Sequence, residues 1–298
     1  MTLTVSSFLE FRSTVKALTL ISAAALSSHV ASAQSQAPTE SHAQQEISHE
    51  LETYASFDET TPPGNIAIGP DGRKFLSVHG FYGQPVKIVE LFNDGSVKPY
   101  PSEAWASNPD ENQIGFYDVL GLNVDQNGVL WMLDTSGDDH AGRLVGWNTR
   151  SETLEKIIYI AMPLINAGSF LNDLAIDNKH GKIYLADTAS NNRAAIVVVD
   201  IKTGQARRVL EGSEYTQAED VDMIIEGRVI TLGGQPARLG VNPITIDVDS
   251  NWLYFGAMSG SAIYRVKTDD LVDLSLDMDA LEDKIQRYGD KSLSDGIT

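Results

Sequence analysis

The sequence predicts an all-β fold, a six-bladed β-propeller that is here truncated within its fifth blade. The first observation is a set of four short runs rich in Ile, Val and Tyr, at residues 171–177, 182–187, 194–201 and 205–210. Turn residues such as Asn178, Gly181 and Gly204 separate these runs, which predicts an antiparallel four-stranded sheet. Residues 195–199 are apolar without alternation, so both faces of this sheet should be covered, as they are in a propeller blade.

The second observation is that the opening of this blade recurs along the chain. Similar segments begin near residues 64, 120, 242 and 294, and a turn with a second apolar run follows each of the first three. The equivalent positions are Ala67, Asn123, Ala175, Thr245 and Thr298, with steps of 56, 52, 70 and 53 residues. A period of this size corresponds to one blade plus its connection.

The last copy, Ser294–Thr298, stops within its first strand. A propeller has to close, because an open stack leaves apolar sheet faces in water. We therefore expect the chain to be a fragment, and a six-bladed ring would need about 100 further residues at this repeat length. The alternative is a closing blade supplied by the N-terminal segment, where residues 51–57 could add a strand, or by a second chain.

The N-terminal region predicts export. Residues 1–33 are typical of a signal peptide: Arg12 and Lys16 precede the short apolar stretch 17–26, and Ala31-Ser32-Ala33 resembles a cleavage site. The apolar stretch is too short to span a bilayer. Residues 34–49 form a polar linker, and residues 50–298 form the incomplete propeller. We expect a secreted or periplasmic protein without a membrane anchor.

Composition limits the partners and the chemistry. The chain has no cysteine, which excludes disulfides, thiolate metal sites and a cysteine nucleophile. Its formal charge of −19 argues against binding to nucleic acid or to anionic membranes. We expect a small-molecule ligand as the partner, and a monomer.

Several segments together resemble the yellow / major royal jelly protein family in its bacterial form. They are Gly64–Val78, WMLDT at 131–135, FLNDLAID with IYLADT, VVVDIKTG with ARRVL, and WLYFGAMSGSAIYRV at 252–266. The resemblance covers roughly residues 51–298 and implies a secreted six-bladed propeller that binds a small molecule in its central channel. It does not imply one chemistry, since the family includes binders of biogenic amines and proteins named for dopachrome conversion.

A more distant resemblance, to gluconolactonase-like (regucalcin-type) propellers, implies an alternative function. Those proteins hold a divalent metal with side chains from the starts of inner strands, and the matching positions here are Asn172, Asn242 and Asp295. Gly64 occupies the position where that pattern has a glutamate. The resemblance thus implies calcium or zinc as a cofactor and a metal-dependent lactonase or esterase, with one carboxylate missing from the cage.

The geometry of propellers points to the same residues on physical grounds. Inner strands converge on the axis, so polar side chains at their starts should share one cavity. The predicted ligand-binding residues are Asn172, Asp173, Asn242 and Asp295. The alternative is that these side chains only satisfy backbone groups or hold ordered water. No histidine occupies a repeat-equivalent strand position, so no catalytic residue is assigned.

Overall fold

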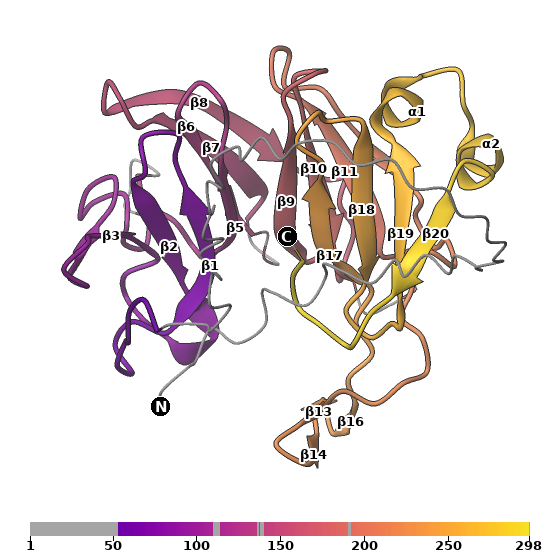
Figure 1. Cartoon of the computed structure of the whole chain (residues 1–298), viewed down its shortest axis with the longest axis horizontal. Helices are drawn as coiled ribbons and strands as arrows, with labels where there is room; N and C mark the ends of the chain where they lie inside the picture. The colour runs from indigo at the N-terminus through magenta and orange to yellow at the C-terminus, as the bar shows by residue number, and fades with distance from the viewer. Residues whose placement is uncertain (1–52, 110–113, 136, 138–139, 190–191, 298) are drawn as a thin grey trace, which may run out of the picture. The chain divides into compact units, whose positions relative to one another are not determined.

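The computed structural model describes residues 53–109, 114–135, 137, 140–189 and 192–297, and those from Ala55 onward belong to one compact unit. Four antiparallel four-stranded sheets follow one another along this part of the chain, each a simple meander (Figure 1). They are blade one, β1(Pro63–Ile68), β2(Lys74–Val78), β3(Ile88–Leu91) and β4(Val97–Pro99); blade two, β5(Val119–Val124), β6(Val129–Asp134), β7(Gly142–Asn148) and β8(Thr153–Ile160); blade three, β9(Leu171–Asp177), β10(Lys182–Asp187), β11(Ala195–Asp200) and β12(Ala206–Val209); and blade four, β17(Val241–Ile246), β18(Trp252–Ala257), β19(Ala262–Lys267) and β20(Gln286–Asp290).

Blade three confirms the prediction from continuous apolar runs. Its first two strands begin and end where the sequence places them. On one face, Tyr184 and Ile196 pack with Phe255 of blade four. On the other face, Ile183 and Val197 pack in a hydrophobic cluster with residues of blade two. Both faces of this sheet are therefore covered, which removes the need for alternating polar residues.

The first strand of each blade is its inner strand. β1 contacts β5, β5 contacts β9, and β9 contacts β17, so the inner strands of successive blades lie against each other. Because each of these strands begins at the same end of its blade, their first residues lie at one end of the row. This arrangement positions the candidate site.

Two insertions depart from the simple repeat. The long step before blade four contains two small hairpins, β13(Ile224–Ile225) with β14(Arg228–Val229) and β15(Thr231–Leu232) with β16(Gln235–Pro236), which extend away from the blade sheets in Figure 1. Two short helices, α1(Thr268–Val272) and α2(Met278–Glu282), separate β19 from β20. Asp277 caps the second of these by accepting a hydrogen bond from the Ala280 amide at 2.9 Å.

The ends of the propeller segment differ from the predicted strands. Residues 294–297, the described part of the fifth repeat copy, form no strand. A lone inner strand has no second strand to pair with. Residues 53–57 also form no strand, although Ala55 and Phe57 pack against blade one. The predicted signal peptide and linker, residues 1–49, lie outside the described residues.

No helix within the described ranges combines the length and the hydrophobicity needed to cross a membrane.

Candidate functional site: the polar mouth of the inner strands

A β-bulge at the start of every inner strand positions the site. The register with the second strand shifts by one residue between Pro63 and Ile66 in β1, and equivalent shifts occur in the other three inner strands. A bulge inserts an extra residue and re-aims the side chains beside it. Two positions of each inner strand are affected. In blades one to four, the first position holds Gly64, Leu120, Asn172 and Asn242, and the second holds Asn65, Gly121, Asp173 and Pro243. We call the region that contains Asn65, Asn172, Asp173, Asn242 and Asp295 the polar mouth.

Asp173 is bonded to blade one across blade two. The Asn65 side-chain amide donates a hydrogen bond to Asp173 Oδ1 at 3.1 Å, and the backbone amide of Leu174 donates to the same oxygen at 2.8 Å. Gly121, the equivalent residue of blade two, has no room for a side chain. A Cβ there would lie 2.7 Å from the Asn172 carbonyl oxygen and 2.8 Å from Asp173 Cα. The missing side chain lets blades one and three meet.

Asn242 and Asp295 form the second half of the polar mouth. The buried Asn242 amide donates hydrogen bonds to Asp295 Oδ1 at 2.5 Å and to the Asp295 carbonyl oxygen at 2.8 Å. Its own carbonyl oxygen accepts from the Thr188 hydroxyl at 3.4 Å. These bonds fix the segment that follows blade four against the starts of the inner strands.

The two carboxyl groups influence each other. The pKa of Asp173 is raised to about 7: burial is the main cause and the negative charge of Asp295 adds to it, while the hydrogen bonds from Leu174 and Asn65 oppose the rise. Burial of its carboxyl also raises the pKa of Asp295, even though much of the residue is solvent-exposed. The structure thus places Asn242 in contact with Asp295, and the charge of Asp295 acts on Asp173.

Asn172 differs from its neighbours in the polar mouth. Its side chain is half-buried and makes no hydrogen bond to any described residue. It is thus not held by the predicted partners Asn242 and Asp295.

The predicted metal ligands do not present a cage of oxygens in this arrangement. The Asn242 amide turns its N–H group, not its oxygen, toward Asp295. The missing glutamate position, Gly64, lies against the Ser77 hydroxyl. Among the described residues, no group of three or more His, Cys, Asp or Glu side chains is arranged to hold a metal ion. The donor set does not fit calcium or zinc without a flip of the Asn242 amide.

An aromatic loop lies beside the polar mouth. Residues 79–83, His79-Gly80-Phe81-Tyr82-Gly83, contain the short 3-10 helix η1(Gly80–Tyr82). The His79 ring nitrogen Nδ1 accepts the Phe81 amide at 3.4 Å, and Gly83 ends the turn with φ of 70°. The rings of Phe81 and Tyr82 are 72% and 61% exposed. The His79 ring lies 4.6 Å from the first and 5.7 Å from the second.

Two contacts connect this aromatic loop to the other blades. Phe81 lies 6.1 Å from the ring of Phe170, which precedes the inner strand of blade three. Gly80 lies so close to the Asp118 carboxylate that a Cβ would be 2.1 Å from its Oδ1. Burial raises the pKa of both Asp118 and Asp295; Lys87 and then His79 oppose the rise at Asp118, and His79 opposes it at Asp295. The loop is therefore fixed next to the polar mouth.

Asn65 and Gly121 are residues that the sequence analysis missed, whereas His79 belongs to an aromatic loop, 79–83, whose composition suggests either the lining of a pocket or packing over the next blade. The repeat itself carries the signal for the first two, because Asn65 and Gly121 occupy the same repeat position as Asp173. His79 gives no such signal, because it lies in a loop outside the repeated strands.

The strand-end pairs Asp134-Thr135 and Asp187-Thr188, which the sequence marks as repeated, are structural. Asp134 accepts a hydrogen bond from the Asp118 amide at 2.9 Å and pairs with Arg143 at 2.5 Å. Asp187 accepts from the Phe170 amide at 2.7 Å and pairs with Arg208 at 2.5 Å. Each aspartate ties the segment entering its inner strand to the end of its second strand.

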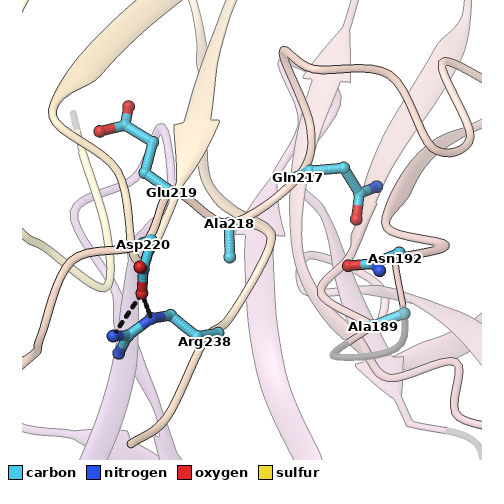
Figure 2. A pocket seen from close by; sticks show the side chains of 7 residues that line it. All are labelled: Ala189, Asn192, Gln217, Ala218, Glu219, Asp220 and Arg238. Atoms are coloured by element: carbon cyan, nitrogen blue, oxygen red, sulfur yellow. Dashed lines mark hydrogen bonds and ion pairs between the residues drawn. The ribbon is translucent and has the colours of Figure 1, made fainter.

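A depression of about 150 Å³ is lined by residues other than those of the polar mouth. Figure 2 shows it between Asn192 and Gln217 on one side and Glu219, Asp220 and Arg238 on the other. Arg238 is paired with Asp220 and Asp222 at 2.8 Å, and Glu219 is bonded to Ser261. Since its charged groups are satisfied by each other, we regard the polar mouth as the better candidate site.

The fold defines the class of this protein as a β-propeller with repeated inner-strand bulges. The sequence model of the major royal jelly protein family matches residues 118–297, more than half of the chain. The chain belongs to this family, which confirms the resemblance seen in the sequence. No curated protein sequence matches the chain.

Three solved structures illustrate the more distant similarity. A protein of unknown function from Bacteroides thetaiotaomicron is 11% identical with a TM-score of 0.42, and the match covers 70% of this chain and 42% of that one. An auxiliary nutrient binding protein from Bacteroides ovatus is 16% identical with a TM-score of 0.40, over 69% and 39% of the two chains. The Dos1 propeller is 9% identical with a TM-score of 0.41, over 70% and 45%. The chain thus spans less than half the length of each of these three proteins.

Proposed function

We propose that this protein binds a small molecule in its central channel, at the polar mouth. The observation that carries the proposal is the convergence of Asn65, Asp173, Asn242 and Asp295 from separate blades and from the segment after blade four. Burial disfavours the charged forms of both carboxyl groups, the charge of Asp295 adds to this effect at Asp173, and such perturbed groups cluster at functional sites. A ligand that donates hydrogen bonds to these oxygens would relieve that cost.

A thermal-shift experiment tests this proposal. The purified protein is screened against small organic compounds, including amines and saccharides, and compared with Asp173→Asn and Asp295→Asn. A true ligand at 100 times its Kd stabilises by about 2.7 kcal/mol, and thus raises Tm by about 5–10 °C for a domain of this size. Asp249→Asn, an exposed carboxyl on a blade-four turn, serves as the control and should retain the shift. Equal shifts in all variants would place binding elsewhere.

A metal-dependent lactonase or esterase is the second candidate. One observation favours it: Asn242 and Asp295, which occupy the same position in the repeat, are in direct contact. A metal between them would have to turn the Asn242 oxygen inward. Calcium or zinc should then raise Tm in the wild type and not in Asp295→Ala. No shift with millimolar metal leaves only the binding protein.

We also propose that the propeller has six blades and is exported as a monomer. The outward face of blade four supports further blades, because Trp252 and Tyr254 are only partly covered there and Tyr288 is 55% exposed. The family membership and the predicted signal peptide support secretion. The charge of −19 supports a protein that does not bind nucleic acid or anionic membranes. Sedimentation of the exported protein tests both its mass and its oligomeric state.

A further inference from the structure

We propose that the ligand of the polar mouth is a saccharide, whose ring packs on the aromatic loop while its hydroxyl groups bind Asn172, Asp295 and His79. This inference rests on the proposed function and names the ligand class of the same site.

The aromatic loop has the features of a stacking platform. Phe81 and Tyr82 expose most of their ring surface, although large apolar side chains in water forgo a favourable burial. Their positions are fixed by the hydrogen bond from the Phe81 amide to the His79 ring and by the close contact between Gly80 and the Asp118 carboxylate. Rigid rings bind a flat partner at little entropic cost. One face of a pyranose presents C–H groups, which pack well on an aromatic face.

The polar groups beside this platform match hydroxyl chemistry. The Asn172 amide makes no hydrogen bond to the described residues, so it offers both a donor and an acceptor. Because His79 Nδ1 accepts the Phe81 amide, the neutral ring carries its proton on Nε2 and donates from there. A hydroxyl group both donates and accepts, so a mixed set of this kind suits it better than an oxygen-only metal site.

Charge favours a neutral ligand over an anion. Asp118 and Asp295 lie near the loop, and Asp173 interacts with Asp295; the negative charge of these groups would repel a phosphate or carboxylate. The raised pKa of Asp173 also reduces the site's attraction for a cation near neutral pH. These charges therefore favour a neutral polyol as the ligand.

Saturation-transfer NMR tests the proposal directly. The probes are methyl β-glucoside, methyl α-mannoside, N-acetylglucosamine and cellobiose, with tyramine as an aromatic amine. We expect transfer to the ring C–H protons of at least one saccharide. The double variant Phe81→Ala/Tyr82→Ala should bind about tenfold more weakly, a loss of about 1.4 kcal/mol, because it removes both exposed rings of the loop. Tyr159→Ala is the matched control, because Tyr159 is 59% exposed on β8, outside the loop.

The outcomes separate this inference from the function on which it rests. Binding of tyramine without any saccharide overturns the saccharide proposal and keeps the small-molecule site. Saccharide binding that survives the double variant, with an unchanged Tm, overturns the assignment to the aromatic loop. If none of these probes binds and the thermal-shift screen also finds no ligand, both proposals fail together.

Discussion

Asp173 is a carboxyl group that feels the negative charge of Asp295, and it accepts hydrogen bonds both from Leu174 in its own blade and from Asn65 in blade one. Its pKa of about 7 in the folded state lies well above the value of an unfolded aspartate. The folded protein therefore binds more protons than the unfolded chain between about pH 4 and pH 7.

This difference gives a pH prediction for Asp173. A raised folded pKa stabilises the protein below the unfolded pKa, and that contribution is lost as the pH rises toward 7. Asp173→Asn has no proton to lose. As the pH rises through this window, the unfolding free energy of the variant should therefore increase relative to that of the wild type, by up to about 1.4 kcal/mol per pH unit. Urea denaturation of both proteins at pH 4.5, 6 and 8 measures the difference. Parallel pH profiles would contradict the raised pKa.

Gly121 gives a steric prediction at the same site. Its replacement by alanine places a methyl group against the backbone of Asn172 and Asp173, which cannot rotate away. We expect a loss of about 1–3 kcal/mol in unfolding free energy and a weaker bond between Asn65 and Asp173. Gly289→Ala is the control, because a Cβ there meets nothing within 4 Å. Equal stability of the two variants would show that the inner strands can separate at this point.

The strands of the blades could be predicted closely from sequence, whereas the elements between them could not. Continuous apolar runs such as 195–199 can only be strands covered on both faces, and the structure confirms them. The hairpins at 224–236 and the helices at 268–282 lie in connections, where no repeat constrains the chain, although Leu271 and Leu281 of the helices pack into the core. The candidate site follows the same distinction: Asp173 and Asn242 lie in the repeat, which points to them, whereas the loop of His79 lies outside the repeat and reaches the region only through its tertiary contacts.

The Asp134–Arg143 pair allows a prediction for an element, because it connects the end of β6 to β7. Both side chains are almost completely buried, and Arg143 also donates to the Gly115 carbonyl at 2.6 Å. Arg143→Met leaves a buried carboxylate without its partner, which should cost about 3–5 kcal/mol. Arg287→Met, which removes an exposed ion pair with Asp290, should cost less than about 1 kcal/mol. Chemical denaturation compares the two, and a small loss for Arg143→Met would mean that water reaches Asp134.

At the scale of the whole molecule, negative charge exceeds positive charge by a wide margin. The chain has 41 acidic and 22 basic side chains, and basic residues such as Arg73, Arg208 and Arg238 are already paired with carboxylates. The remaining carboxylates repel one another, and this repulsion destabilises the compact state.

Salt should therefore stabilise the protein. Raising NaCl from 0.02 M to 0.5 M shortens the screening length from roughly 20 Å to roughly 4 Å. Long-range repulsion between exposed carboxylates is lost, while ion pairs at contact distance lose less. Each 1 kcal/mol of relieved repulsion raises Tm by about 2–4 °C in a domain of this size, and we expect a rise of that order. KCl at the same concentration should give the same rise, because screening depends on ionic strength alone. A fall in Tm would mean that the ion pairs, and not the excess of carboxylates, dominate the electrostatic free energy of this propeller.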